Sequence, residues 1–177
     1  MITALYLFLV QGVLGAFDTL YYHEWRARLP ARGILSAPEL KLHAARDFLY
    51  AVLFGTLPWL AWQGRWTWLL IGVLVTEIVL TLTDFVVEVS VRKTLGDVYG
   101  GERVTHAIMG ILYGAMIASL IPVLVEWAAL PTALVIRPAD APLMLRTALL
   151  LMAVGVLVSG LRDLYAAYEL PHGAWPW

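Results

Sequence analysis

Five long apolar segments constrain the fold more than any other feature of this chain. They cover residues 2–25, 38–62, 66–91, 103–127 and 143–168. At about 1.5 Å per residue, each is long enough to cross a hydrocarbon core of about 30 Å as a helix. Charged residues make up only 14% of the chain, whereas a globular domain carries about 25%. The sequence therefore predicts an all-α membrane protein with five transmembrane helices, in which residues 1–177 form a single membrane domain.

The breaks between these segments carry ordinary turn signals. The first segment has neither a basic stretch before it nor a small-residue cleavage site after it, so we interpret it as a spanning helix and not a removable signal. Residues 63–65 form a tight break, and residues 130–142 are rich in proline. Such a composition is typical of an ordered surface loop.

Basic residues indicate the orientation. The first and third loops, with the helix ends beside them, carry Arg26, Arg28, Arg32, Lys41, Arg46, Arg92, Lys93 and Arg103. The opposite side carries Arg65, Arg137 and Arg146. The positive-inside rule then places the N-terminus outside and the C-terminus in the cytoplasm, in a cytoplasmic membrane. The expected outer interface holds an aromatic belt of Trp59, Trp62, Trp66, Trp68 and Trp127. The net charge of −1 gives no reason to expect a nucleic-acid partner, and membrane lipids are the expected surroundings.

Two parts of the chain share one polar spacing. Glu39, His43 and Tyr50 recur at the same intervals as Glu102, His106 and Tyr113. Upstream, Gln11, Asp18, Tyr22 and Arg26 match Glu77, Asp84, Glu88 and Arg92. The pattern indicates a duplicated helix-loop-helix unit over residues 2–62 and 66–127. Because both copies start on the same side, they are expected to form a four-helix bundle with a pseudo-twofold axis along the membrane normal, outside which lies the fifth helix, 143–168.

Ionisable side chains inside spans usually face a bundle interior or a cavity. The predicted helices place most of the repeated polar residues on interior stripes near the cytoplasmic end. The candidate metal ligands of the repeat are Asp18, Glu39, His43, Asp84, Glu88, Glu102 and His106. Asp18 is expected about a turn deeper than the Glu and His pairs, which favours Glu88 over it. His23 and Glu24 lie in the same zone without repeat counterparts, and are candidates for asymmetric ligation.

Four carboxylates and two histidines from four helices resemble the ligand set of ferritin-like di-iron and di-manganese bundles. The resemblance is limited to ligand number and helix distribution, because the spacing here is Glu-x-x-x-His where those bundles have Glu-x-x-His. It implies two divalent ions. Carboxylate-rich ligation favours iron, with manganese or zinc as alternatives. The chain has no cysteine, which removes thiolate and iron–sulfur ligation.

The resulting prediction is a membrane-embedded di-iron oxidoreductase acting on a lipid-soluble molecule. The substrate would enter from the bilayer between the bundle and the fifth helix, and Tyr50 and Tyr113 are candidate catalytic residues. A zinc hydrolase would use the same ligands with an activated water. A second alternative is a b-type haem protein with His43 and His106 as axial ligands. A third is a proton or cation transporter in which Glu77, Asp84 and Glu88 mark the path and a homo-oligomer could complete the pore.

A structural interpretation without metal is also open. The same acids would then be neutralised by Arg46, Arg92, Arg103 and Arg162 in a buried ion-pair network. Tyr50 and Tyr113 would be packing residues. Asp163, next to Arg162 in the fifth segment, would pair locally or dock that helix on the bundle.

Overall fold

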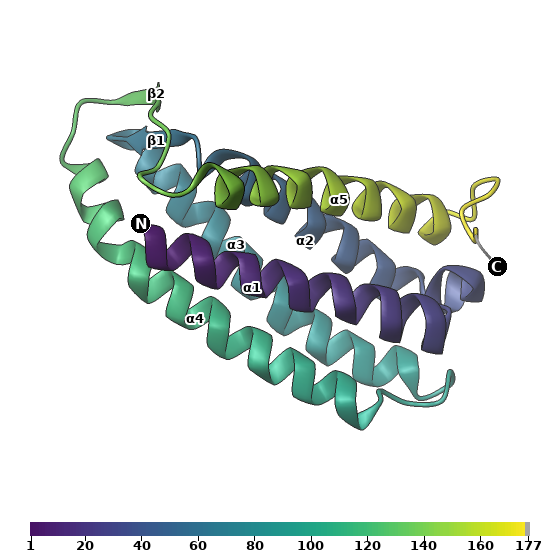
Figure 1. The fold of residues 1–177 in the computed structure, drawn as a ribbon. Coiled ribbons are helices and arrows are strands. Elements are labelled where there is room, and N and C mark those ends of the chain that lie inside the picture. Colours follow the sequence, from purple (N-terminus) through teal and green to yellow (C-terminus); the bar gives the residue numbers. More distant parts are fainter. Residues whose placement is uncertain (176–177) are drawn as a thin grey trace.

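The computed structural model describes residues 1–175 and is almost entirely helical (Figure 1). The elements in chain order are α1 (Ile2–Phe17), the π-helix η1 (Asp18–Ala27), the 3-10 helix η2 (Leu29–Leu35), α2 (Ala37–Thr56), β1 (Leu60–Gln63), α3 (Arg65–Arg92), α4 (Gly100–Ala128), β2 (Ala133–Ile136) and α5 (Leu143–Ala167). η1 continues α1 without a break, so the first helical rod runs from Ile2 to Ala27.

Four helices are long and apolar enough to cross a membrane. They are Ile2–Ala27, Arg65–Arg92, Gly100–Ala128 and Leu143–Ala167. Many of their large apolar side chains face outward, which is the pattern expected of helices surrounded by lipid. The prediction of a helical membrane protein is supported at this level. Helix α2 is shorter and carries Glu39, Lys41, Arg46 and Asp47, so its crossing as a fifth span stays a prediction.

The helices surround a common interior. Close backbone contacts form a ring: α4 lies against α1, α1 against α5, α5 against α2, α2 against α3, and α3 against α4. Helix α5 therefore lies between α1 and α2 and forms part of the wall, where the sequence placed it outside a bundle of the first four helices. The N-terminus and both strands lie at one end of the molecule, and η1, η2 and the C-terminal segment lie at the other (Figure 1).

The second helix is shorter than its apolar run suggests. It was expected to reach residue 62 but ends at Thr56, just before Pro58, which cannot donate a helical hydrogen bond. Residues 60–63 instead pair antiparallel with β2, Leu60 opposite Ile136 and Gln63 opposite Ala133. The all-α prediction was wrong here, because this pairing joins segments far apart in the sequence, one of them inside the loop expected at 130–142.

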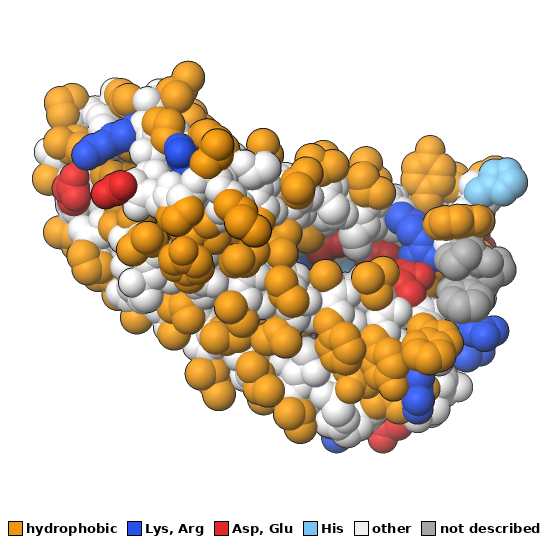
Figure 2. Space-filling view, viewed as in Figure 1, with side chains coloured by type: hydrophobic (Ala, Val, Ile, Leu, Met, Phe, Trp, Pro, Cys, Tyr) orange, Lys and Arg blue, Asp and Glu red, His pale blue; other side chains and the backbone are white. Residues whose placement is uncertain are grey.

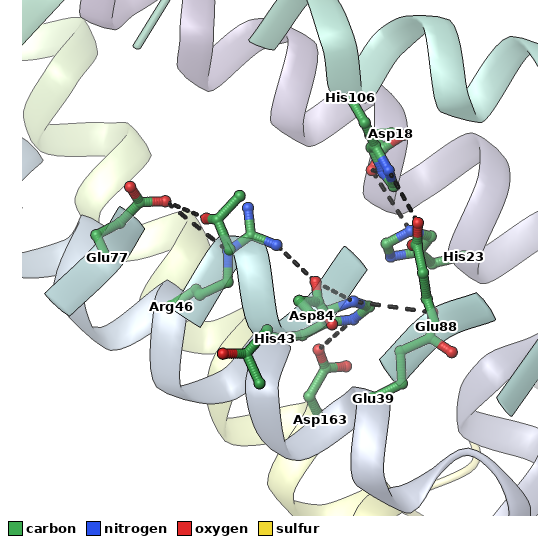
Figure 3. A network of polar contacts seen from close by, with 12 residues as sticks. Asp18, His23, Glu39, His43, Arg46, Glu77, Asp84, Glu88, His106 and Asp163 are labelled. Atoms are coloured by element: carbon green, nitrogen blue, oxygen red, sulfur yellow. Dashed lines mark hydrogen bonds and ion pairs between the residues drawn. The ribbon is translucent and has the colours of Figure 1, made fainter. Parts of the chain in front are cut away.

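The interior is divided along its length. Toward the strands it is apolar, with the rings of Phe8 on α1 and Phe54 on α2 packed at a tilt, 4.2 Å between centroids. Leu70 and Leu120 are buried in the same cluster. Toward η1 the interior becomes polar, and it is there that the charged side chains of the spanning helices meet (Figure 3). The apolar half leaves these charges remote from water on the strand side.

Candidate metal centre

Six carboxylates and three imidazoles form one buried group in the polar half of the interior (Figure 3). Each of these carboxylates has an oxygen within 3.9 Å of a histidine nitrogen. We call this group the acid–histidine cluster; its members are Asp18, His23, Glu39, His43, Asp84, Glu88, Glu102, His106 and Asp163. All nine are buried. The cluster thus draws on η1, α2, α3, α4 and α5.

His106, on α4, organises one side of the cluster. Its Nε2 lies 3.0 Å from Asp18 Oδ2, and its Nδ1 lies 3.6 Å from Glu88 Oε1. One face of the imidazole stacks on Phe85, with ring centroids 5.1 Å apart. Packing therefore fixes the ring plane while both nitrogens face carboxylates. Asp18 and Glu88 both reach His106, so the expected preference for Glu88 over Asp18 does not appear in the geometry.

His43, on α2, organises the other side. Its Nε2 lies 3.3 Å from Asp84 Oδ2 and 3.9 Å from Glu39 Oε1. Its Nδ1 faces Asp163 of α5, with Oδ2 at 3.9 Å. Three carboxylates from three different helices therefore surround one imidazole.

His23 joins the two sides. Its Nε2 lies 3.4 Å from Asp18 Oδ2 and 3.2 Å from Glu102 Oε1. Its ring stacks on His43 with centroids 4.6 Å apart and planes within 7°. The π-helix explains this position: with its wider turn, residues five apart share a face, so Asp18 and His23 both point inward. In an α-helix they would diverge by about 140°.

The two sides share one contact at positions that match in the repeat. His43 on α2 meets Asp84 on α3, and His106 on α4 meets Asp18 of η1. The correspondence ends at the arginines. Arg92 reaches into the cluster, whereas its sequence counterpart Arg26 lies over the ring of Tyr99, 4.7 Å from the centroid. The duplication itself stays a prediction.

Two arginines compensate part of the negative charge. Arg92 donates through Nε to both oxygens of Glu39, at 2.9 and 2.9 Å, and through Nη2 to Glu102 Oε1 at 3.0 Å. Arg46 donates through Nη1 to Asp84 Oδ2 at 2.7 Å. The metal-free interpretation therefore has real ion pairs. Of the other two arginines it named, Arg103 pairs with Asp97 at the surface.

These pairs leave the cluster strongly anionic. Six carboxylates against the guanidinium groups of Arg46 and Arg92 leave four negative charges when the imidazoles are neutral. Uncompensated charge in a low-dielectric interior costs several kcal/mol per ion. Protonating all three imidazoles would still leave one negative charge. Two divalent cations would balance all four.

Several potential metal-ligand atoms of the cluster have no hydrogen-bond partner among the described residues. They are Asp18 Oδ1, Asp84 Oδ1, Glu88 Oε2 and His23 Nε2. Roughly 90% or more of buried polar groups in proteins are paired, so four such atoms in one group indicate room for a ligand. Three overlapping sets have their ligand atoms within 4.8 Å of one another: Asp18, His23 and His106; His23, Glu39 and His43; and Glu88, Glu102 and His106.

Three of the predicted site residues lie outside the cluster. Glu24 pairs with Arg162 of α5. Tyr50 donates to Glu77 Oε1 at 2.9 Å and accepts from Gln11 Nε2 at 3.3 Å. The Tyr113 ring lies 6.1 Å from that of Tyr50, and its buried hydroxyl has no hydrogen-bond partner among the described residues. A catalytic role for either tyrosine stays a prediction.

Glu77 and its hydrogen-bond donors form a separate polar group beside the cluster. Besides Tyr50, its Oε1 accepts from Thr81 at 2.6 Å. Arg46 lies between the two groups, because its Nε is 3.9 Å from Glu77 Oε1 while its Nη1 binds Asp84. Glu77 thus has three partners of its own, and it touches no histidine among the described residues.

Asp163 is the cluster member that was not among the predicted ligands. The signal was present, since a carboxylate in the apolar run of α5 is expensive unless it faces a partner. That partner, His43, belongs to a helix distant in sequence. The repeat, which ordered the other candidates, does not include α5.

Comparisons with known proteins give no relative from which a role could be transferred. No family model matches the chain, and no curated protein or solved structure does so either. The interpretation of the cluster therefore follows from its geometry and charge.

Proposed function

We propose that the acid–histidine cluster binds two divalent metal ions and forms the centre of a membrane-embedded oxidoreductase. The observation that carries the proposal is a buried group of six carboxylates and three imidazoles with only two arginines to balance it, in which four potential ligand atoms have no hydrogen bond among the described residues. Hard, carboxylate-rich donors with a minority of imidazoles suit iron or manganese, and iron is the ion we propose.

Each side of the cluster has donors for one ion. On one side stand His43, Glu39 and Asp84. On the other, His106 would share an ion with Asp18 through Nε2 or with Glu88 through Nδ1, because the two carboxylates lie at opposite nitrogens of its ring. His23 and Glu102 lie where the sides meet, because His23 Nε2 contacts Glu102 and Asp18 and belongs to possible ligand sets on both sides. His23 could therefore complete either ion, and Glu102, a carboxylate with two oxygens, could serve both. Asp163 would orient His43 through Nδ1, as outer carboxylates orient ligating imidazoles.

The arginines would fix the carboxylates and not compete for the ions. Arg92 engages Glu39 and Glu102 in charge-assisted hydrogen bonds, which set the orientation of both. Arg46 does the same for Asp84. Such bonds leave other lone pairs of the carboxylates available. Asp84 Oδ1, for example, has no hydrogen-bond partner among the described residues.

The apolar surroundings of the cluster support the proposal of an oxidoreductase. A pair of bound iron ions would supply the electron-transfer chemistry that these side chains lack. The chain's own residues would hold those ions in an interior bordered by apolar packing and reached from the lipid phase. A zinc hydrolase would need the same donors, so metal identity separates the two functions.

The haem alternative fits the geometry less well. Both nitrogens of His43 face carboxylates, at 3.3 and 3.9 Å, and one face of its ring is covered by His23. An axial ligand needs a free nitrogen directed at a flat porphyrin. The space around His43 is filled by acids and by a second imidazole, which suit separate metal ions better.

Elemental analysis of purified protein, with absorption and Mössbauer spectra of the same iron-57 sample, tests the proposal. We expect about two metal ions per chain and the spectrum of non-haem iron. A Soret band would support the haem alternative, and stoichiometric zinc the hydrolase. A folded, monodisperse protein without metal would refute the proposal in favour of the ion-pair network.

We also propose that α2 crosses the membrane beside α5, as a fifth span, and that the chain arose from a duplicated unit. The N-terminus and the last described residues lie at opposite ends of the molecule (Figure 1), as an odd number of crossings requires. Glu39 and His43 of α2 are buried in the cluster and Arg46 binds Asp84, so α2 exposes less charge to lipid than its composition suggests; Lys41 is its exposed charge.

A further inference from the structure

The surface of the molecule has a hollow between α1 and α5. Figure 2 shows apolar side chains over most of this face and acidic side chains at the bottom of the hollow. The hollow lies over the half of the interior that contains the cluster (Figures 1 and 2). The charged interior is therefore reached from the side of the helical wall that would face lipid.

Glycines mark the strand-side limit of this hollow. At Gly12 the two helices touch: a Cβ there would come within 2.5 Å of Met152 Sδ on α5 and 2.9 Å of Phe54 Cζ. One turn further along each helix, a Cβ at Gly15 or Gly155 would meet nothing within 4 Å. Because residues three apart lie on neighbouring positions of one helix face, the contact between α1 and α5 ends there and the space opens.

An ion pair closes the other end. Arg162 of α5 pairs with Glu24 of η1 through Nη1, and its Nε donates to the carbonyl oxygen of Trp175 at 2.9 Å. From Met152 to Arg162 is ten residues of α5, or about 15 Å of helix. We call the opening between these two contacts the α1–α5 window.

The window is apolar at its rim and acidic beneath. Apolar side chains cover most of the face around the opening (Figure 2). Each helix also contributes one buried acid to the cluster, Asp18 at the start of η1 and Asp163 on α5. An occupant must therefore be apolar along most of its length. Where it meets the metal-loaded cluster it must not carry a net charge, because two divalent ions already balance the cluster and any further charge would be uncompensated in the low-dielectric interior.

We infer that the α1–α5 window admits the substrate, and that the substrate is a single-chain lipid-soluble molecule with one neutral polar group, such as a long-chain alcohol or aldehyde. This inference rests on the proposed function. The chain would lie between the apolar rims and the polar group would reach the cluster. Fatty-acid anions and charged phospholipid head groups would bring a charge that the balanced cluster leaves uncompensated. The contacts at Gly12 and Arg162 hold both ends of the window and limit its size.

Photolabelling with a defined probe tests this. The metal-loaded protein in lipid nanodiscs would be exposed to hexadecanol bearing a diazirine next to the hydroxyl group, and labelled residues located by mass spectrometry. We expect labels on η1 and α5 around Asp18 and Asp163, and several-fold fewer with the equivalent palmitate probe at neutral pH. Equal labelling by both probes would overturn the substrate class.

Substitutions at the window separate entry from metal binding. Gly15→Trp and Gly155→Trp should each lower labelling near the cluster several-fold while leaving metal content unchanged, since a Cβ at either position meets no cluster side chain within 4 Å. Gly114→Trp is the matched control, because Gly114 on α4 is also exposed with nothing within 4 Å of a Cβ. Labelling near the cluster that is unchanged in both window variants would refute entry through the window. Window-dependent labelling of a metal-free wild type would keep the window and remove the proposed function.

Discussion

The imidazole of His23 lies parallel to that of His43, with ring centroids 4.6 Å apart. One ring comes from the π-helix η1 and the other from α2, so the stack joins two elements on different sides of the cluster. Two stacked imidazolium ions would repel each other, whereas two neutral imidazoles can each offer a nitrogen to a metal ion. The stack is therefore better suited to coordination than to a network of protonated histidines.

The central position of His23 gives the first prediction. His23→Ala should lower metal affinity at least about tenfold. Loss of a residue that only orients a metal ligand already costs that much, and loss of a ligand should cost more. Metal titration monitored by absorption would measure it. His172→Asn, in the C-terminal segment, is the control, since asparagine tolerates the positive φ of 66° found there. Equal affinities in the two variants would exclude His23 as a ligand.

Two glutamates of α3 give a matched pair. Glu88 contacts His106 and has an oxygen without a partner, whereas Glu77 is held by Tyr50 and Thr81. Glu88→Gln should lower metal content, because a neutral amide cannot balance the charge of an ion in low dielectric. Glu77→Gln should leave the metal in place. In a transporter the order of damage would be reversed, and a proton-flux assay in liposomes would show it.

A substitution of Arg92 tests whether the cluster binds cations or is only an ion-pair network. Its side chain is 1% exposed and bridges Glu39 and Glu102. Arg92→Ala should destabilise the protein by about 3–5 kcal/mol, because it leaves buried carboxylates uncompensated. Denaturant unfolding of metal-free protein would measure this. Added metal should recover part of the loss in a cluster that binds cations, and none of it in a pure ion-pair network.

The contribution of α5 can be tested at Asp163. Asp163→Asn removes the charge facing His43 Nδ1, at 3.9 Å. Metal affinity should fall about 10–100-fold, the usual effect of losing a carboxylate that orients a ligating histidine. Asp140→Asn, in the exposed loop before α5, should have no effect. An unchanged affinity in Asp163→Asn would make α5 a packing helix only.

Topology provides a prediction independent of metal. A reporter fused after residue 175 should be active on the cytoplasmic side, since Lys and Arg concentrate at that end. A reporter inserted in the loop between β2 and α5 should be active outside. Activity of both reporters on one side would mean that α5 does not cross the membrane, and would contradict the positive-inside assignment.

Much of the fold could be predicted because membrane spans depend on local composition. The segments expected at 66–91, 103–127 and 143–168 became α3, α4 and α5 with end shifts of at most three residues. The paired strands could not be predicted in this way, because β1 and β2 depend on a contact between distant segments. The role of α5 in the wall is also non-local: its closest partner is α2, with which it shares no sequence pattern.

The candidate site was predictable where α-helical periodicity holds. Glu39 and His43, like Glu102 and His106, lie in the cluster from helices that keep the ordinary turn. His23 was expected only as an asymmetric addition, because its inward direction depends on the π-helix. Tyr22, the residue favoured by α-helical spacing, instead approaches Gly101 and Tyr99. A local change of helix type thus altered which side chain enters the site.

The central claim is that two metal ions lie among these histidines, and anomalous X-ray scattering at the iron edge tests it most directly. Crystals of protein purified with iron should show two anomalous peaks inside the cluster, one near His43 and one near His106. Both peaks should disappear when data are collected below the edge. A cluster without anomalous density in iron-saturated crystals, with Arg46 and Arg92 alone neutralising the acids, would contradict the account.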